Sequence, residues 1–261
     1  MTDKVLIAVR EGVCTLTFNR PERLNAIDME MLEALVAALD AAAADTATRV
    51  VVLAGAGRAF CAGADIGQMV ERTPADWERI VERYLDPVRR IAALDKPVIA
   101  RLHGDVVGGG LGLAMACDLR IAAANARFCA PFIKLALAGC DMSAGYFLPR
   151  LVGLGLATDM MMTGRFVDAE EAGRGGLVNR VVPEAELDAE AAALAQGFAR
   201  GPAAALAVTK RAIRRSLDRD MAAEFDYEVF VQVQCLQSAD HKEGVAAFLG
   251  RRPPRFAGAP Q

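Results

Sequence analysis

The sequence GRAFCAGADI at residues 57–66 and the sequence HGDVVGGGLG at residues 103–112 form a matched pair. Each follows a short apolar run, at residues 49–53 and 98–102, that predicts a buried strand. Each also leads toward a stretch with helical periodicity. The start of a helix leaves backbone N–H groups without partners inside the chain. Two such starts aimed at one point could hold a carbonyl oxygen as it gains negative charge.

Outward from this pair, strands alternate with helices along most of the chain. A hairpin is predicted at 4–10 and 13–19, and further strands at 49–53, 98–102, 119–123, 127–130 and 177–182. Helices are predicted at 29–44 behind the N-cap Asp28, at 75–94, 110–117, from Asp141 to about Leu151 and at 156–163, and a turn at Ala169–Gly173. After about residue 186 only helices are expected, at 187–200, 203–217, 221–237 and 242–249. The pattern predicts an α/β core with an α-helical C-terminal part.

The composition restricts the class of protein. Of 261 residues, 54% are hydrophobic and 24% are charged, which is typical of a soluble folded chain. The net charge of −3 gives no electrostatic reason to expect nucleic acid. No stretch approaches the roughly 20 apolar residues that cross a bilayer, and the charged N-terminus does not resemble a signal peptide. We therefore expect no membrane and no nucleic-acid partner.

The six cysteines are scattered without paired spacing, which favours a reducing cytoplasm. With two histidines in the chain, no cluster has the spacing of metal ligands, and we expect no metal. Basic residues gather at 210–211, 214–215 and 251–252. Such short clusters favour a solvated helix face, with a site for a phosphorylated ligand as the alternative.

An ordered series of short motifs runs along almost the whole chain. Its members are Asn19-Arg20-Pro21, Asn25-Ala26, residues 60–66, Lys96-Pro97, Gly108-Gly109-Gly110, Cys117-Asp118, Leu148-Pro149-Arg150, Thr163-Gly164-Arg165, Ala172-Gly173-Arg174 and residues 243–249. Each is weak alone, but in this order they resemble the crotonase superfamily, the enoyl-CoA hydratase/isomerase family. The resemblance implies a crotonase-like spiral of ββα units over residues 1–200. It implies a helical oligomerisation region over residues 201–261, and a homotrimer or a dimer of trimers.

The resemblance also implies an acyl-CoA thioester as ligand, with coenzyme A as part of the substrate and no separate cofactor. The oxyanion hole would consist of the Ala64 and Gly109 N–H groups, and a glycine at 109 would let the thioester approach closely. Alternatively, the triple glycine only lets the next helix pack tightly. The residues that would hold coenzyme A are Arg23, Leu24, Ala26, Ala62, Asp65 and Ile66, with Phe248 and Arg251 as weaker matches that could reach a neighbouring subunit's ligand.

The chain departs from the hydratase pattern at two positions. Hydratases of the family carry glutamates where this chain has Gly112 and Phe132, so both acid–base groups for adding water are absent. Asp141 is the nearest candidate carboxylate, and it would be catalytic, the N-cap of a following helix, or both. Phe132, Gly112 and Tyr146 are candidates for the acyl pocket, although core packing is an alternative for Tyr146.

The predicted function is therefore an acyl-CoA-processing enzyme that stabilises a thioester enolate, in fatty-acid or related acyl-CoA metabolism. It would be a lyase or an isomerase. Because one carboxylate can shuttle a proton between two carbons, isomerisation fits the residues better than hydration. The alternatives are a non-catalytic acyl-CoA-binding homologue and a dehalogenase-like enzyme that uses Asp141 as nucleophile.

Overall fold

The structure is a computed structural model, and it describes residues 4–257. The chain starts with the predicted hairpin, formed by the antiparallel strands β1 (Val5–Arg10) and β2 (Val13–Phe18). Both residues of its two-residue turn have positive φ, 50° at Glu11 and 77° at Gly12. This turn geometry matches the twist of the paired strands, so the hairpin prediction is confirmed.

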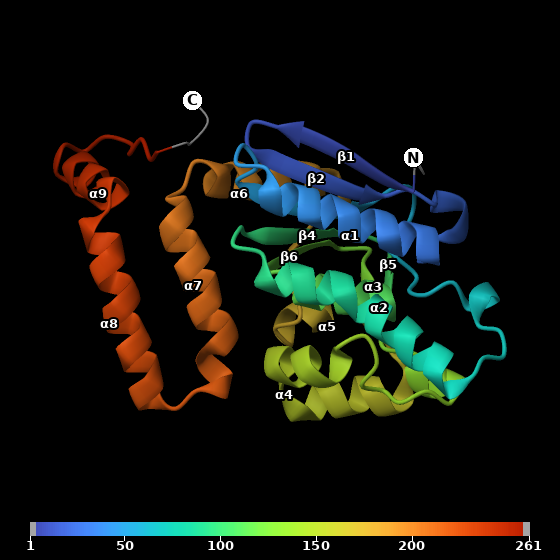
Figure 1. The fold of residues 1–261 in the computed structure, drawn as a ribbon. Coiled ribbons are helices and arrows are strands. Elements are labelled where there is room, and N and C mark those ends of the chain that lie inside the picture. Colours follow the sequence, from blue (N-terminus) through green and yellow to red (C-terminus); the bar gives the residue numbers. More distant parts are fainter. Residues whose placement is uncertain (1–3, 258–261) are drawn as a thin grey trace.

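Two sheets organise the core (Figure 1). The larger has the order β1-β2-β3-β4-β6-β9, and its later strands are β3 (Val50–Gly55), β4 (Val98–Leu102), β6 (Leu119–Ala123) and β9 (Arg180–Val182). The smaller has the order β5-β7-β8, with β5 (Asp105–Val107), β7 (Arg127–Cys129) and β8 (Phe166–Asp168). β4 is followed by β5 and β6 is followed by β7, so consecutive strands along the chain alternate between the two sheets. The expected α/β class with a ββα core is confirmed.

Successive residues of a strand point to opposite faces of the sheet. Different helices cover the two faces of the larger sheet, so neighbouring residues of one strand pack against different helices. Val50 and Val52 of β3 pack with one side of α6 (Leu187–Ala199). Val51 and Leu53 point into the main core. The helices that build that core are α1 (Met29–Ala44), α2 (Pro74–Ala93), α3 (Gly109–Ala116) and α4 (Ala144–Thr163).

Three predictions about single elements need correction. The turn predicted at Ala169–Gly173 is wrong, since α5 spans Ala169–Arg174 and Asp168 caps it by accepting the Glu171 N–H at 2.8 Å. The two helices predicted from Asp141 to about Leu151 and at 156–163 are present as the two parts of α4, which are separated by a kink at Gly153 (φ 74°), but the first begins at Ala144 rather than directly after Asp141. The last strand is shorter than predicted, and the three-residue strands β5 and β8 have no prediction, because so short a strand carries little periodicity.

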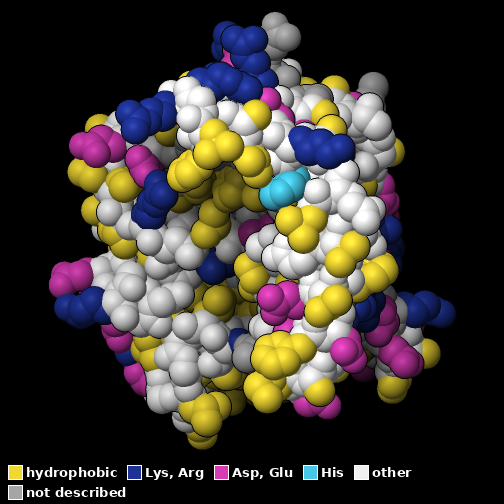
Figure 2. All heavy atoms as spheres, turned by 90° about the vertical axis from the view of Figure 1, so that its left-hand side faces the viewer, with side chains coloured by type: hydrophobic (Ala, Val, Ile, Leu, Met, Phe, Trp, Pro, Cys, Tyr) yellow, Lys and Arg dark blue, Asp and Glu magenta, His cyan; other side chains and the backbone are white. Residues whose placement is uncertain are grey.

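The C-terminal helices are α7 (Ala203–Arg215), α8 (Met221–Gln237) and α9 (Ala239–Leu249), as the sequence predicts within a few residues. A short 3-10 turn, η5 (Ser216–Asp218), lies between α7 and α8. Helices α8 and α9 extend away from the sheets (Figure 1). Figure 2 shows hydrophobic side chains around a hollow on this face. None of the helices in residues 4–257 has the length and apolar character to span a membrane.

Candidate active site

The loop that contains Ala64 is held by a backbone ladder to an earlier segment. The Ile27 N–H donates to Gly63 O at 2.7 Å, and the Asp65 N–H donates to Ile27 O at 2.9 Å. These bonds lie on both sides of Ala64 and leave its own N–H without a partner among residues 4–257. Gly63 has φ +94°, a conformation that glycine adopts without strain. The local backbone therefore presents one free N–H group.

A second free N–H group belongs to Gly109, the first residue of α3. Its N–H lies in the first helical turn and has no hydrogen-bond partner in the described part of the chain. A Cβ built on Gly63 would lie 3.1 Å from the Gly109 nitrogen, and one built on Gly109 would lie 3.7 Å from the Ala64 nitrogen. The matched segments thus bring both predicted donors to one place.

The wall beside these donors comes from the segment 131–142. Phe132 is 7% exposed and lies next to Gly108, and Met142 is 4% exposed. A Cβ on Gly112 would lie 2.3 Å from Met142 O, so the backbone of Met142 occupies the space of a side chain at 112. Gly112 therefore contributes no side chain but allows Met142 to approach. Gly112 and Phe132 therefore place no acid or base beside the donors.

Asp141 belongs to this segment and is half-buried. Its Oδ1 accepts the N–H of Met142 at 2.7 Å, while its Oδ2 has no partner among the residues that the structure describes. Ser143 holds the N-cap position of α4, and its side chain makes no capping bond. The alternative that Asp141 is the N-cap is wrong, because Met142 (φ 49°) and Ser143 (φ 65°) turn the chain sharply before the helix starts.

Tyr146 lies on α4, and its polar end turns to the C-terminal helices. Its hydroxyl donates to Asp218 Oδ2 at 2.9 Å, and the Arg150 guanidinium lies 3.8 Å from the centre of its ring. The side chain borders a hollow between α4 and α7. The hydroxyl partner Asp218 lies 72 residues away along the chain, and the acyl-pocket role of Tyr146 stays a prediction.

The six candidate residues for coenzyme A come from two adjoining segments, 23–26 and 62–66. The Ala62 N–H donates to Leu24 O at 2.9 Å, which joins the segments. Arg23 and Ile66 are exposed, so both are open to a ligand. The Asp65 carboxylate already accepts the Gly67 N–H at 3.2 Å and contacts Arg20 at 3.1 Å, so it also has a structural role.

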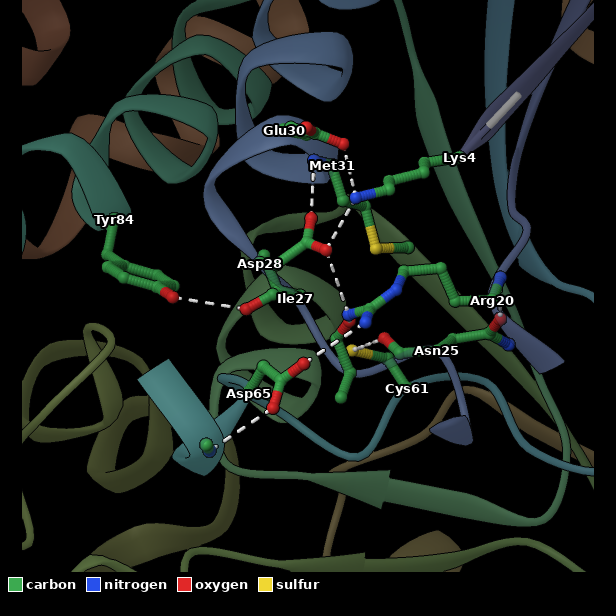
Figure 3. A network of polar contacts seen from close by, with 12 residues as sticks. Lys4, Arg20, Asn25, Ile27, Asp28, Glu30, Met31, Cys61, Asp65 and Tyr84 are labelled. Carbon is green, nitrogen blue, oxygen red and sulfur yellow. Dashed lines mark hydrogen bonds and ion pairs between the residues drawn. The ribbon is translucent and has the colours of Figure 1, made fainter. Parts of the chain in front are cut away.

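A polar network behind these segments contains residues to which sequence reasoning assigned no role (Figure 3). Arg20 donates to Ala26 O at 2.5 Å and contacts Asp28 at 3.3 Å in addition to Asp65. Asp28 also pairs with Lys4 at 2.7 Å and caps α1 through the Met31 N–H. The predicted N-cap role of Asp28 is confirmed, and the motif Asn19-Arg20-Pro21 is the sequence signal that could have pointed to Arg20 as its partner.

Burial and pairing oppose each other at Asp28. Burial works to raise the pKa of this carboxyl, but Lys4, the Met31 N–H and Arg20 together hold its pKa below the ordinary value. Nearby, burial raises the pKa of the Tyr84 hydroxyl, which donates to Ile27 O at 3.1 Å. Both groups hold the segment that aligns Ala64.

Asn25 is fully buried and joins the same segment to the next loop. Its Nδ2 donates to the carbonyls of Ala59 at 2.8 Å and Ala56 at 2.9 Å, and its Oδ1 accepts the Arg20 N–H at 2.8 Å. Cys61 is also buried in this loop, and burial raises the pKa of its thiol to about 12. A thiol that remains protonated is a poor nucleophile.

The basic cluster predicted as a solvated helix face on α7 divides into two groups. Lys210 is 8% exposed and pairs with Asp118 at 2.9 Å, so the prediction is wrong for this residue. Arg211 and Arg215 are exposed, as expected. Among residues 4–257, no group of three or more His, Cys, Asp or Glu side chains gathers as a metal ion would require.

The sequence of this chain is similar to those of known proteins over almost its whole length. Residues 8–259 match the family model described as enoyl-CoA hydratase/isomerase. The chain is 39% identical to the 1,2-epoxyphenylacetyl-CoA isomerase of Escherichia coli, over 99% of this chain and 100% of that protein. It is 37% identical to a probable enoyl-CoA hydratase of Rhodobacter capsulatus, over 96% of both.

The fold is similar to solved structures as well. A putative enoyl-CoA hydratase from Streptomyces coelicolor superimposes with a TM-score of 0.94 at 38% identity, covering 98% of this chain and 94% of that one. A probable enoyl-CoA hydratase/isomerase from Mycobacterium abscessus has a TM-score of 0.91 at 34% identity, over 98% and 99% of the two chains.

Proposed function

This chain belongs to the enoyl-CoA hydratase/isomerase family and is an acyl-CoA-processing enzyme of it, and we infer that its reaction is an isomerisation through a thioester enolate. The observation that carries this proposal is the close approach of the two free N–H groups at Ala64 and Gly109. Neither Gly112 nor Phe132 carries a carboxylate. This disfavours hydration, because water addition needs a base and an acid.

The two N–H groups would bind the thioester oxygen. Removing an α-proton from an acyl-CoA moves negative charge onto this oxygen, and preorganised donors stabilise that charge more than they stabilise the neutral carbonyl. The ladder around Ala64 and the packing of α3 hold both donors in place before the substrate arrives. Phe132 and Met142 are apolar and would keep water away from the enolate.

Asp141 would move the proton. Its Oδ2 is free to face a ligand. The next residue, Met142, lies against both Gly109 and Gly112. One carboxylate can take a proton from one carbon and return it to another, which is an isomerisation of the acyl group. The non-catalytic and dehalogenase-like alternatives are not favoured, since the relatives are named as hydratases and as an isomerase.

Several broader assignments belong to the same proposal. Coenzyme A would bind along residues 23–26 and 62–66 as part of the substrate, with no separate cofactor. The enzyme would act in fatty-acid or related acyl-CoA metabolism as a homotrimer or a dimer of trimers, with residues 201–261 as the oligomerisation region. The six free cysteines support a cytoplasmic location.

The variant Asp141→Asn tests the proton-transfer role. Asparagine keeps the oxygen that accepts the Met142 N–H, so we expect the fold and the binding of butyryl-CoA to be retained. Isomerisation of 3-hexenoyl-CoA to the 2-enoyl thioester should fall by about 10²–10⁴-fold. Glu71→Gln, in the loop after residue 66, is the matched control and should keep wild-type turnover. Equal turnover in wild type and Asp141→Asn would exclude Asp141 as the acid–base group.

A further inference from the structure

The helix that carries Gly109 is short and entirely buried, which creates a problem at its other end. All eight residues of α3 are buried. The last carbonyl groups of any helix lack partners inside that helix, and a buried carbonyl without a partner destabilises the fold. The C-terminal end of α3 therefore needs donors from elsewhere in the chain.

Two arginines supply these donors. Arg120, on β6, donates to Cys117 O at 2.7 Å, and Arg214, on α7, donates to Ala116 O. A positive charge at the C-terminal end of a helix also complements the helix dipole. Arg214 is the notable donor, because it comes from the C-terminal helices and lies 98 residues from Ala116 along the chain.

Asp118 fixes Arg214 in this position. Its Oδ1 contacts Arg214 at 2.9 Å, and its Oδ2 contacts Lys210 at 2.9 Å and accepts the Val98 N–H at 2.8 Å. Lys210 also donates to the carbonyl of Ile91 at 2.9 Å. One face of α7 is thereby fastened to the ends of α2 and α3 and to the start of β4.

The same end of α7 also contacts the helix that follows Asp141. The Arg214 guanidinium lies 5.4 Å from the ring centre of Phe147, in the first turn of α4. Asp218, in η5, accepts the Tyr146 hydroxyl at 2.9 Å and pairs with Arg150 at 3.5 Å. The α7–η5 junction thus touches both elements that border the active site, α3 and α4.

We propose that Arg214 is a positioning residue, which holds the distal end of α3 so that the Gly109 N–H at the other end points at the thioester oxygen. Eight helical residues span about 12 Å, and a packed helix moves as a rigid unit, so a shift at Ala116 is transmitted to Gly109. The proposal rests on the oxyanion role of Gly109 given above. It also links the C-terminal helices to the active site.

The test measures how strongly the bound thioester carbonyl is hydrogen-bonded, and it does not require turnover. Butyryl-CoA labelled with carbon-13 at the thioester carbonyl is bound to wild type, Arg214→Gln, Arg214→Lys and Arg211→Gln, and the carbonyl stretching band is recorded by infrared spectroscopy. Arg211 lies on the same helix in an exposed pair with Asp95 at 3.2 Å, so its variant is the matched control. Affinity for butyryl-CoA and melting temperature are recorded in parallel.

We expect the carbonyl band of wild type to shift to lower frequency on binding, as donors weaken the C=O bond. The shift should be smallest in Arg214→Gln, intermediate in Arg214→Lys, which keeps a charge but not the forked donor, and unchanged in Arg211→Gln. Isomerisation of 3-hexenoyl-CoA by Arg214→Gln should fall by up to roughly 100-fold, with butyryl-CoA affinity retained.

The outcomes separate the two proposals. A lower melting temperature with a wild-type carbonyl shift in Arg214→Gln would mean that Arg214 is only structural, and the inference would fail. If Arg214→Gln does not fold, Arg214→Lys decides, and a wild-type shift in that variant overturns the inference. No shift in wild type itself would instead refute the oxyanion hole.

Discussion

Gly112 shows how one residue restricts the chemistry. Because a Cβ at this position would lie 2.3 Å from Met142 O, the site has no room for a glutamate side chain at 112. We predict that Gly112→Glu does not produce a hydratase and instead lowers the free energy of unfolding by about 1–3 kcal/mol, the usual range for overpacking. Urea denaturation and a crotonyl-CoA hydration assay measure the two effects.

The control for this substitution is Gly155→Glu. No atom outside its own helix lies within 4 Å of a Cβ built at Gly155, so the same chemical change should leave stability nearly unchanged. A Gly112→Glu variant that is as stable as the control and hydrates crotonyl-CoA would show that the segment around Met142 moves aside. The conclusion that the Met142 backbone leaves no room for a side chain at 112 would then be wrong.

At the scale of elements, Asp28 links β1, α1 and the segment beside Ala64. Its pKa is held below the ordinary value of an aspartate, so its stabilising contribution is present above that ordinary value and is lost as the pH falls through the lower pKa of the folded state. Asp28→Asn keeps an oxygen for the cap of α1 but loses the charge that pairs with Lys4 and Arg20. We predict a loss of about 1–3 kcal/mol at pH 7, since charged partners remain without their carboxylate.

The measurement is the free energy of unfolding in urea at several pH values. The difference between wild type and Asp28→Asn should shrink as the pH falls below the ordinary pKa of an aspartate, because the wild-type carboxylate then becomes protonated. Glu30→Gln is a suitable control, because Glu30 is exposed and also pairs with Lys4. A difference that stays constant with pH would contradict the proposed charge effect.

At the scale of the whole molecule, the C-terminal helices carry large apolar side chains that the single chain leaves exposed. Phe230 is 61% exposed, and Phe248 is 83% exposed. A hollow of about 480 Å³ lies between α7 and α9 and is mostly apolar. Exposed apolar patches of this kind can mark protein–protein interfaces, which fits the proposed homotrimer or dimer of trimers.

We predict that Phe230→Glu reduces the oligomer to smaller species, because a buried unpaired charge opposes association. Analytical ultracentrifugation measures the mass. Glu228→Gln changes an exposed residue on the same helix without adding a charge and should keep the wild-type mass. A Phe230→Glu protein with the wild-type assembly would place the interface elsewhere.

Sequence reasoning worked best where the causes are local. The limits of α1 follow from the Asp28 cap and the apolar periodicity, and the hairpin follows from its alternation and the glycine of its turn. The approach of Ala64 to Gly109 could be expected only from the family resemblance, because 45 residues separate them. The three-residue strands β5 and β8 were not predicted, although β7, which is as short, was.

The amino-acid sequence alone determined the class of fold, the positions of most helices and the two paired glycine-rich segments, because each depends on residue types and their spacing. Only the tertiary structure decided that Met142 closes position 112, that Tyr146 turns to Asp218, and that Lys210 and Arg214 reach Asp118. These contacts join segments far apart in the chain. They depend on how whole elements pack, which no local pattern of residues encodes.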